Sequence, residues 1–362
     1  MKIGIMTFWW TQDNYGQVLQ AYALQKYLSN LGHECFIIKY SFKTPLSLSK
    51  FRSINAKNLK SKLLQFLSKN NRKNNNSFNL FKEKYFTFSK RSYMSWKELK
   101  LNAPEADIYL VGSDQIWNIE HWKTDIINSS FLNFGTAKKI SYAASFGSKT
   151  IRKKFEKKIR PLIKNFHYVS VREKSGINIC KNFNLTNIIH SPDPTFLLPK
   201  NDYYELIKNV KPQNKKYCFV YLIQSEMEYT IKDIEKFLQD KPLEIKLVIA
   251  DSNEFNKNTN YPGVEEFLSY INNAEFIITN SYHCSIFSII FNKQFCVIKR
   301  KLLTAGMNDR FSSLEIFFKL NRFVKDKDFT ILQTQISYEK INESVLKMQK
   351  ESFLNKLGDW NE

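Results

Sequence analysis

Apolar segments of strand length alternate with segments of helical spacing along most of this chain. The expected strands are residues 2–8, 34–40, 106–112, 139–144, 168–171, 217–223, 244–250, 275–279 and 294–298. The expected helices are residues 16–31, 150–166, 229–239, 264–272, 284–291 and 338–357. Since strands that alternate with helices form parallel sheets covered by helices, the pattern predicts an α/β fold.

The alternation occurs in two series, which suits two domains in a chain of 362 residues. We expect a Rossmann-like domain over residues 1–195 and a second over residues 213–335, with a hinge between Pro192 and Pro212. Residues 336–362 should form a C-terminal helix that packs back on the N-terminal domain. In such folds ligands bind beyond the carboxyl ends of the strands, so the loops that follow strands should carry the chemistry.

The positive charge of the chain is concentrated in one segment. The net charge is +21, and residues 41–100 hold 15 Lys and Arg against only Glu83 and Glu98. We interpret this segment as a basic helical insert in the first domain. Within it, residues 58–69 place apolar side chains at helical spacing with lysines on the other faces. Such a helix either lies on an anionic membrane surface or is a surface helix with solvated lysines. Nucleic acid is disfavoured, because no recognised nucleic-acid module accompanies the charge.

Three further observations indicate a cytoplasmic protein. No apolar run approaches the roughly 18 residues that span a bilayer. The first residues do not resemble a secretory signal, because polar residues directly follow a short strand-like run. The five cysteines are scattered without any CxxC spacing, which argues against both a disulfide framework and a structural zinc site.

Four loops that follow expected strands carry the candidate site residues. These are Asn14, Tyr15 and Gly16 in the first loop, Ser113, Asp114, Gln115 and Trp117 in the second, Arg172 in the third, and Asn280, Ser281 and His283 in the fourth. Polar and aromatic side chains at the ends of parallel strands are typical of a site for a carbohydrate or another small polar ligand.

Each of the first two loops has two interpretations. Gly16 lies near a helix start, where free N–H groups and the helix dipole favour an anion. Asn14 can instead be an ordinary N-cap. The loop lacks GxGxxG, so a dinucleotide has little support. Asp114 either belongs to a ligand site or lies in a tight turn and caps the next helix.

The third and fourth loops contain the charged and titratable candidates. Arg172 would lie at the first turn of a helix, where the dipole disfavours a cation, and this suggests a bound carboxylate or phosphate. The alternative is an ion pair with Glu173 or Asp193. His283 is the best acid–base candidate, because its unperturbed pKa lies nearest to the operating pH, although a lone His is more often structural. Cys284 points in another direction at the helix start, which disfavours thiol catalysis. No histidines share metal-ligand spacing, so we expect no metal.

In order along the chain, these loop motifs resemble the polysaccharide pyruvyl transferase family. The matching segments are KIGIMTFWWTQDNYGQVLQAYALQKYLSNLGHE, DIYLVGSDQIWN, SYAASFG, SVREKSG, SPDPTFLL and TNSYHCSIFSIIFNKQFCVI. They fall within residues 1–40 and 105–320. The resemblance implies a two-domain fold like that of the GT-B glycosyltransferases, with the active site in the cleft between the domains.

The resemblance also implies phosphoenolpyruvate as donor, a sugar diol as acceptor, a cyclic pyruvate ketal as product and no cofactor. Arg172 matches the family arginine implicated in donor binding, and His283 matches the near-invariant histidine. Two positions depart from the pattern. Ser281 stands where many members have Arg, and Cys284 stands where Gly often follows the histidine. Arg310 or a lysine of the basic segment is the candidate replacement for the missing cation.

The chemistry of ketal formation suits these residues. His283 can protonate the methylene carbon of the donor and return as a base, and Asp114 can take the proton of the attacking hydroxyl. We expect a transferase that modifies a capsule or exopolysaccharide building block, linked to undecaprenyl pyrophosphate, at the inner face of the cell membrane. One alternative is a GT-B-type glycosyltransferase that uses a nucleotide sugar, and another is a non-catalytic member of the fold.

If the basic segment binds a membrane, deletion of residues 58–76 should weaken binding to anionic liposomes more than it weakens turnover of a soluble acceptor. The reason is that the segment supplies positive charge that attracts anionic lipid, and it lies outside the motifs that we expect to form the active site. Liposome co-sedimentation and turnover are measured on the same preparation. Equal loss of both would mean that the segment belongs to the active site or to the fold.

Overall fold

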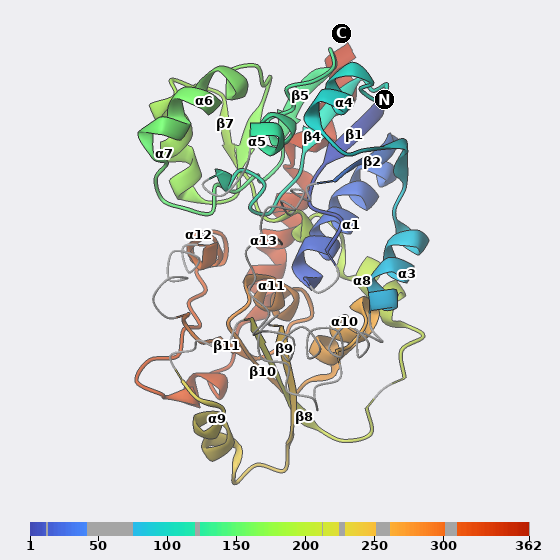
Figure 1. Cartoon of the computed structure of the whole chain (residues 1–362). Coiled ribbons are helices and arrows are strands. Elements are labelled where there is room, and N and C mark those ends of the chain that lie inside the picture. The colour runs from blue at the N-terminus through green and yellow to red at the C-terminus, as the bar shows by residue number, and fades with distance from the viewer. Residues whose placement is uncertain are drawn as a thin grey trace, which may run out of the picture.

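The computed structural model describes residues 1–11, 14–41, 75–119, 124–211, 213–223, 229–250, 261–300 and 310–361. Within these ranges, no helix has the length and apolar character that a membrane span requires. The expected helix over residues 58–69 lies outside the described residues. Figure 1 shows two α/β domains, the first at the top and the second at the bottom.

A parallel five-stranded sheet in the order β3-β2-β1-β4-β5 forms the centre of the first domain. Its strands are β1 (Lys2–Met6), β2 (Glu34–Tyr40), β3 (Phe88–Tyr93), β4 (Ile108–Val111) and β5 (Lys138–Ser141). The short parallel pair β6 (Val169–Val171) and β7 (Ile188–His190) continues it through a bridge between Ile140 and Tyr168. Strands such as β4 are apolar throughout, because helices cover both faces of a parallel sheet.

The helices described in the first domain are α1 (Tyr15–Asn30), α3 (Asn75–Tyr85), α4 (Trp96–Leu101), α5 (Thr124–Ser130), α6 (Lys153–Ile163) and α7 (Lys174–Asn182). The connection to the second domain then forms α8 (Lys200–Ile207), whose Tyr203 ring packs against Phe287 of that domain. Two of these helices, α1 and α6, lie where the sequence pattern predicts helices. The order of strands and helices gives the expected Rossmann-like topology.

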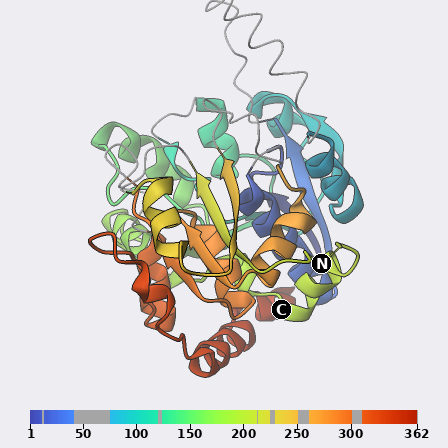
Figure 2. The same cartoon turned by 90° about the horizontal axis from the view of Figure 1, so that it is seen from below.

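The second domain contains a parallel four-stranded sheet in the order β11-β10-β8-β9. Its strands are β8 (Tyr217–Ile223), β9 (Glu244–Ala250), β10 (Phe276–Thr279) and β11 (Phe295–Val297), and its helices are α9 (Ile231–Leu238), α10 (Val264–Asn273), α11 (Tyr282–Ile290) and α12 (Ser312–Phe318). Figure 2 shows α9 (yellow) and α10 (orange) on opposite sides of this sheet, and they pack on separate apolar clusters. The predicted class, two Rossmann-like domains, is confirmed.

The basic segment over residues 41–100 differs from the expected insert. Its second part is integrated into the first sheet, because β3 pairs in parallel with β2 at the sheet edge. The sequence pattern does not predict β3, because its Lys90, Arg91 and Ser92 are all exposed. Charged residues of this kind are common on edge strands, where they discourage pairing with other chains. Residues 42–74 lie outside the described part of the chain.

Apolar packing joins the two domains. A single cluster of buried residues contains side chains of β1 and α1 together with side chains of β8, β10, α10 and α11. At its centre the Tyr15 ring stacks on Phe267 of α10, with centroids 4.1 Å apart. The Tyr15 hydroxyl also donates to the Pro262 carbonyl over 2.6 Å. A hydrophobic contact of this kind holds two domains in a fixed relation.

The last helix, α13 (Tyr338–Lys350), leads from the second domain towards the first (Figure 1). Near its end, the Gln349 side chain donates to the carbonyls of Phe196 and Leu198. A 3-10 segment (Phe353–Asn361) then follows, and the Phe353 ring stacks on Tyr142 of the first domain. The α-helix therefore ends at Lys350, earlier than the expected residue 357, and the 3-10 segment continues to Asn361.

We expect Phe267→Ala to lower the free energy of unfolding by roughly 3–5 kcal/mol, because it removes a fully buried ring from the contact between the domains. Urea unfolding monitored by circular dichroism measures the change. Leu101→Ala, at a position 74% exposed, is the control and should change stability by less than about 0.5 kcal/mol. Equal stability of the Phe267 variant and the native chain would contradict this description of the interface.

Candidate active site

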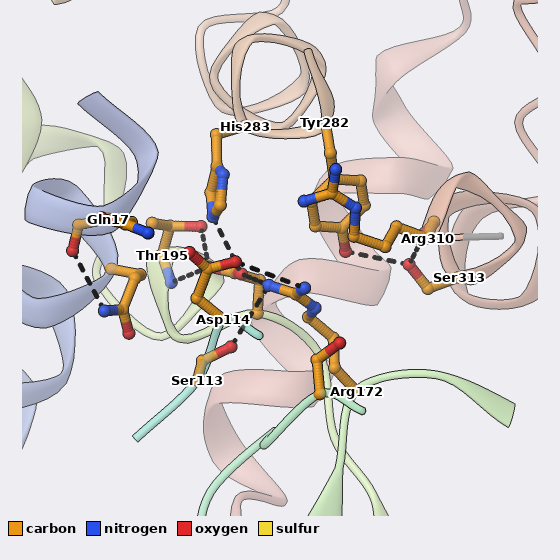
Figure 3. A network of polar contacts seen from close by, with 12 residues as sticks. Gln17, Ser113, Asp114, Arg172, Thr195, Tyr282, His283, Arg310 and Ser313 are labelled. Carbon is orange, nitrogen blue, oxygen red and sulfur yellow. Dashed lines mark hydrogen bonds and ion pairs between the residues drawn. The ribbon is translucent and has the colours of Figure 1, made fainter. Parts of the chain in front are cut away.

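The predicted site loops meet at the carboxyl ends of the two sheets. Figure 3 shows His283 and Arg310 pointing from the second domain towards Asp114 and Arg172 of the first. His283 lies in the first turn of α11, and Arg310 lies just before α12. Asp114 follows β4, and Arg172 follows β6.

Asp193 connects the charged residues of the two domains. Its Oδ2 lies 3.0 Å from Nη1 of Arg172 and 3.3 Å from Nε2 of His283. Its Oδ1 accepts hydrogen bonds from the Thr195 N–H and hydroxyl. Burial alone would raise the pKa of this carboxyl, but the facing His283 and Arg172 and the Thr195 N–H hold it well below its usual range. Asp193 is therefore a buried anion that positions both the guanidinium and the imidazole.

Arg172 is completely enclosed and surrounded by carboxylates. Its Nε donates to Glu173 over 3.0 Å, and its Nη1 donates to Asp193 over 3.0 Å. Its Nη2 lies 3.7 Å from Asp114 and has no hydrogen-bond partner among the described residues. Burial lowers the pKa of Arg172, but Glu173, Asp193 and Asp114 together raise it above its ordinary value. The sequence analysis gave an ion pair of Arg172 with Glu173 or Asp193 as the alternative to a bound anion. The structure contains this ion pair with both acids.

Asp114 has a left-handed backbone conformation, which is uncommon for residues other than glycine although Asp and Asn adopt it more readily than most. Its φ is +63°, in the left-handed region, and its side chain is almost fully buried. The carbonyl of Asp114 accepts from the N–H groups of Ile116 and Ser145, which fixes the loop beside the extension of β5. The residues directly after it, 115–118, form turns, so Asp114 does not cap an α-helix there. Strained residues held in this way are frequent at functional sites.

His283 is held between the start of α1 and Asp193. A Cβ added to Gly16 would lie 2.1 Å from Nδ1 of His283, so only glycine permits this close approach. The Ser281 hydroxyl caps α11 by accepting from the Cys284 N–H. Burial raises the pKa of the Cys284 thiol to about 12, which keeps the thiol protonated. The imidazole, rather than the thiol, is the titratable group presented at this helix start.

Two predicted site residues at the start of α1 make contacts within the protein. Asn14 is the N-cap, and its Oδ1 accepts from the Gln17 N–H over 3.2 Å. The Tyr15 side chain is buried in the contact between the domains. Their role in binding substrate stays a prediction.

Other predicted residues stabilise the loops that carry the site. Trp117 is fully buried, stacks on Phe131, and donates from Nε1 to a backbone carbonyl. The Asn280 amide exchanges two hydrogen bonds with the backbone of Ile223, which ties the end of β10 to the end of β8. Ser113 accepts from Nη1 of Arg172 over 3.5 Å. These contacts show that the three residues hold the site loops in place. Their contact with a substrate stays a prediction.

Gln115 offers a polar group next to a tight turn. Its buried Nε2 has no hydrogen-bond partner among the described residues. A Cβ at Gly147, whose φ is +67°, would lie 2.9 Å from that nitrogen. The amide therefore lies close against the backbone of the loop after β5.

Arg300 is a further candidate that the sequence analysis missed. Its Nε donates to the Asn280 carbonyl over 3.2 Å, and only 6% of the residue is exposed. Burial and the nearby Arg310 lower the pKa of Arg300 to about 10. Arg300 follows β11, so the rule that loops after strands carry chemistry could have identified it. Among the described residues, no group of three His, Cys, Asp or Glu side chains is arranged to hold a metal ion.

Comparison with known proteins gives one family match. The model of the family described as Polysaccharide pyruvyl transferase matches residues 14–301. No curated protein matches the sequence. Among solved structures, S. aureus MnaA with UDP superposes with a TM-score of 0.53 at 11% identity, covering 98% of this chain and 91% of that one. A UDP-GlcNAc 2-epimerase of Methanocaldococcus jannaschii gives a TM-score of 0.45 at 12% identity, covering 97% and 94%. The likeness to MnaA shows a shared two-domain, GT-B-type fold.

We expect Asp193→Asn to lower the free energy of unfolding at neutral pH by roughly 3–5 kcal/mol, because it breaks the fully buried ion pair with Arg172 and removes the carboxylate that faces His283. The pKa of Asp193 is lower in the folded state than in the unfolded state. Its contribution is therefore fully present above about pH 4 and is lost as the pH falls through the folded pKa.

The difference between the variant and the native chain should accordingly become smaller below about pH 4. Urea unfolding at several pH values measures it. Asp240→Asn, an isosteric change at an exposed position, is the control. A pH-independent difference, or none, would show that Asp193 is not a buried anion.

Proposed function

Because the chain belongs to the polysaccharide pyruvyl transferase family, we propose that it transfers the enolpyruvyl group of phosphoenolpyruvate to two hydroxyls of a sugar. The product is a cyclic pyruvate ketal on a polysaccharide precursor. The observation that supports this most is the position of His283. Its imidazole is held by Asp193 and Gly16 and points towards the side of the site that carries Asp114 (Figure 3).

Ketal formation requires two proton transfers that these side chains are suited to perform. His283 donates a proton to the methylene carbon, and the positive charge that develops on the adjacent carbon is attacked by the first sugar hydroxyl. Asp114 accepts the proton of that hydroxyl. The carbon–oxygen bond to phosphate then breaks, and the second hydroxyl closes the ring. Of the two hydroxyl protons, one replaces the proton donated to the new methyl group and the other leaves with phosphate, so the reaction is balanced.

The acceptor that we propose is a saccharide linked to undecaprenyl pyrophosphate, at the inner face of the cell membrane. Its support is the positive charge of the first domain. Besides the segment 41–100, helix α6 exposes Lys153, Lys154 and Lys157. Lysines on an exposed face attract anionic lipid and pyrophosphate groups. Capsule or exopolysaccharide assembly is the corresponding pathway class.

A glycosyltransferase that uses a nucleotide sugar is the second candidate. The observation in its favour is the fold, which is shared with MnaA, a protein solved with UDP. The two reactions release different products. A pyruvyl transferase releases phosphate from phosphoenolpyruvate, whereas a glycosyltransferase with a UDP-sugar donor releases UDP.

We expect the native chain to release phosphate from phosphoenolpyruvate only when a suitable lipid-linked saccharide is present. His283→Gln and Asp114→Asn should each lower kcat by about 10²–10⁴, because each removes a group that moves a proton. A coupled phosphate assay measures turnover, and thermal unfolding checks that the variants are folded.

His167→Gln, at an exposed position away from the site, is the matched control and should keep native turnover. Native turnover in folded His283→Gln would exclude the acid–base assignment. Acceptor-dependent release of UDP, without consumption of phosphoenolpyruvate, would establish the second candidate.

A further inference from the structure

Tyr282 is a buried aromatic residue at the candidate site to which the proposed reaction assigns no role. It lies in the first turn of α11, directly before His283, and only 2% of it is exposed. Its ring is part of the apolar cluster that joins the two domains. The same ring also borders two arginines of the site, Arg172 and Arg310. Tyr282 therefore lies where the apolar contact between the domains meets the charged groups.

The ring of Tyr282 faces the guanidinium of Arg172. The central carbon Cζ of that guanidinium lies 5.1 Å from the ring centre. A guanidinium within about 6 Å of the centre of an aromatic ring is attracted by the negative potential of the ring face, most strongly where water is excluded. Water is excluded here, because Arg172 is completely buried and Tyr282 is nearly so.

This contact gives Arg172 a partner from the other domain. Glu173 and Asp193 accept hydrogen bonds from its Nε and Nη1. Both acids follow strands of the first domain, β6 and β7, whereas Tyr282 belongs to α11 of the second. The guanidinium of Arg172 is therefore held from both domains at once.

The hydroxyl of Tyr282 fixes the ring in this place. It lies 2.9 Å from the hydroxyl of Ser313 in α12, and Ser313 donates its own proton to the Arg310 carbonyl over 2.6 Å. Since a hydroxyl has one proton to donate, Tyr282 is the donor in the bond between the two hydroxyls. Burial raises the pKa of Tyr282, although the nearby Arg172 opposes the shift, and this keeps the donor proton in place. Figure 3 shows the connection from Tyr282 through Ser313 to Arg310.

The other neighbours of the ring also belong to the site or border it. The Arg310 guanidinium carbon lies 5.9 Å from the ring centre, and the His283 ring lies 5.6 Å away at an angle of 71°. An aromatic residue that only fills space could be replaced by any ring of the same size. Contact with a cation depends in addition on the electronic structure of the ring, so the two roles can be separated by experiment.

We infer that Tyr282 is a positioning residue, whose ring holds the guanidinium of Arg172 against the carboxylates of the first domain. Arg172 in turn contacts Asp193, and Asp193 contacts His283. The geometry of the charged groups therefore depends on the docking of the second domain. The contact between ring and guanidinium is independent of the reaction, and only its effect on turnover rests on the proposed function.

Two side chains at position 282 test the role of the ring. Tyr282→Phe is the reference, because it keeps the ring and loses only the hydroxyl. A phenylalanine with a fluorinated ring at the same position keeps the size and the apolar character, but fluorine withdraws the negative potential from the ring face. Relative to Tyr282→Phe it should lower kcat for release of phosphate from phosphoenolpyruvate by about tenfold, because the attraction of Arg172 is lost.

The same fluorinated residue in place of Phe329 is the matched control. Phe329 is also buried in the second domain, but it lies in the apolar cluster that contains Ile234 and Leu238 of α9. Its fluorination should leave kcat unchanged. Urea unfolding of the variants measures the effect of fluorination on the folding equilibrium, and the control supplies the part of that effect that is due to packing alone.

Equal kcat of the plain and the fluorinated phenylalanine variants at position 282 would overturn the inference, since the ring would then only fill space. If the native chain does not turn over phosphoenolpyruvate, the proposed function is wrong and the unfolding measurements decide the inference. Fluorination at position 282 should then lower the equilibrium constant for folding by about tenfold more than fluorination at position 329 does. Equal effects at the two positions would overturn the inference.

Discussion

The carboxylate of Asp193 is the interaction on which the geometry of the candidate site depends. It lies in the connection after β7 and contacts Arg172 of the first domain and His283 of the second with the same oxygen. Because the group is fully buried, its charge interacts strongly with both partners. The position of the imidazole therefore depends on contacts from both domains. The apolar packing of Tyr15 on Phe267 holds the two domains in a fixed relation.

The candidate site contains both kinds of charge that the proposed reaction requires. Asp114, Glu173 and Asp193 place carboxylates around Arg172 in the first domain, and Arg310 points towards them from the second (Figure 3). In the proposed reaction a carboxylate such as Asp114 accepts the proton of a sugar hydroxyl, and guanidinium groups can stabilise the charge of the leaving phosphate. His283, which Asp193 contacts, is the group proposed to protonate the methylene carbon.

The sequence predicted the features that depend on local pattern. Strands β4 and β8 were recognisable because they are apolar throughout, and the loops after strands contained Asp114, Arg172 and His283. Strand β3 was missed because its exposed centre has no apolar alternation. The ion pair between Arg172 and Asp193 was among the alternatives, whereas the close approach of Gly16 to His283 and the contact between Asp193 and His283 were not predictable, since they join residues far apart in the chain. Arg300 follows β11 and could have been considered on the rule that loops after strands carry chemistry, but its contact with Asn280, at the end of a different strand, was not predictable.

Mass spectrometry of the acceptor tests the central claim most directly. The native chain is incubated with phosphoenolpyruvate, a UDP-sugar and a panel of lipid-linked saccharides, and every saccharide is weighed before and after. The account predicts that one saccharide gains a single acid-labile pyruvate ketal, with one phosphate released for each ketal formed. A saccharide that instead gains a sugar residue, with UDP released and phosphoenolpyruvate unchanged, would contradict it.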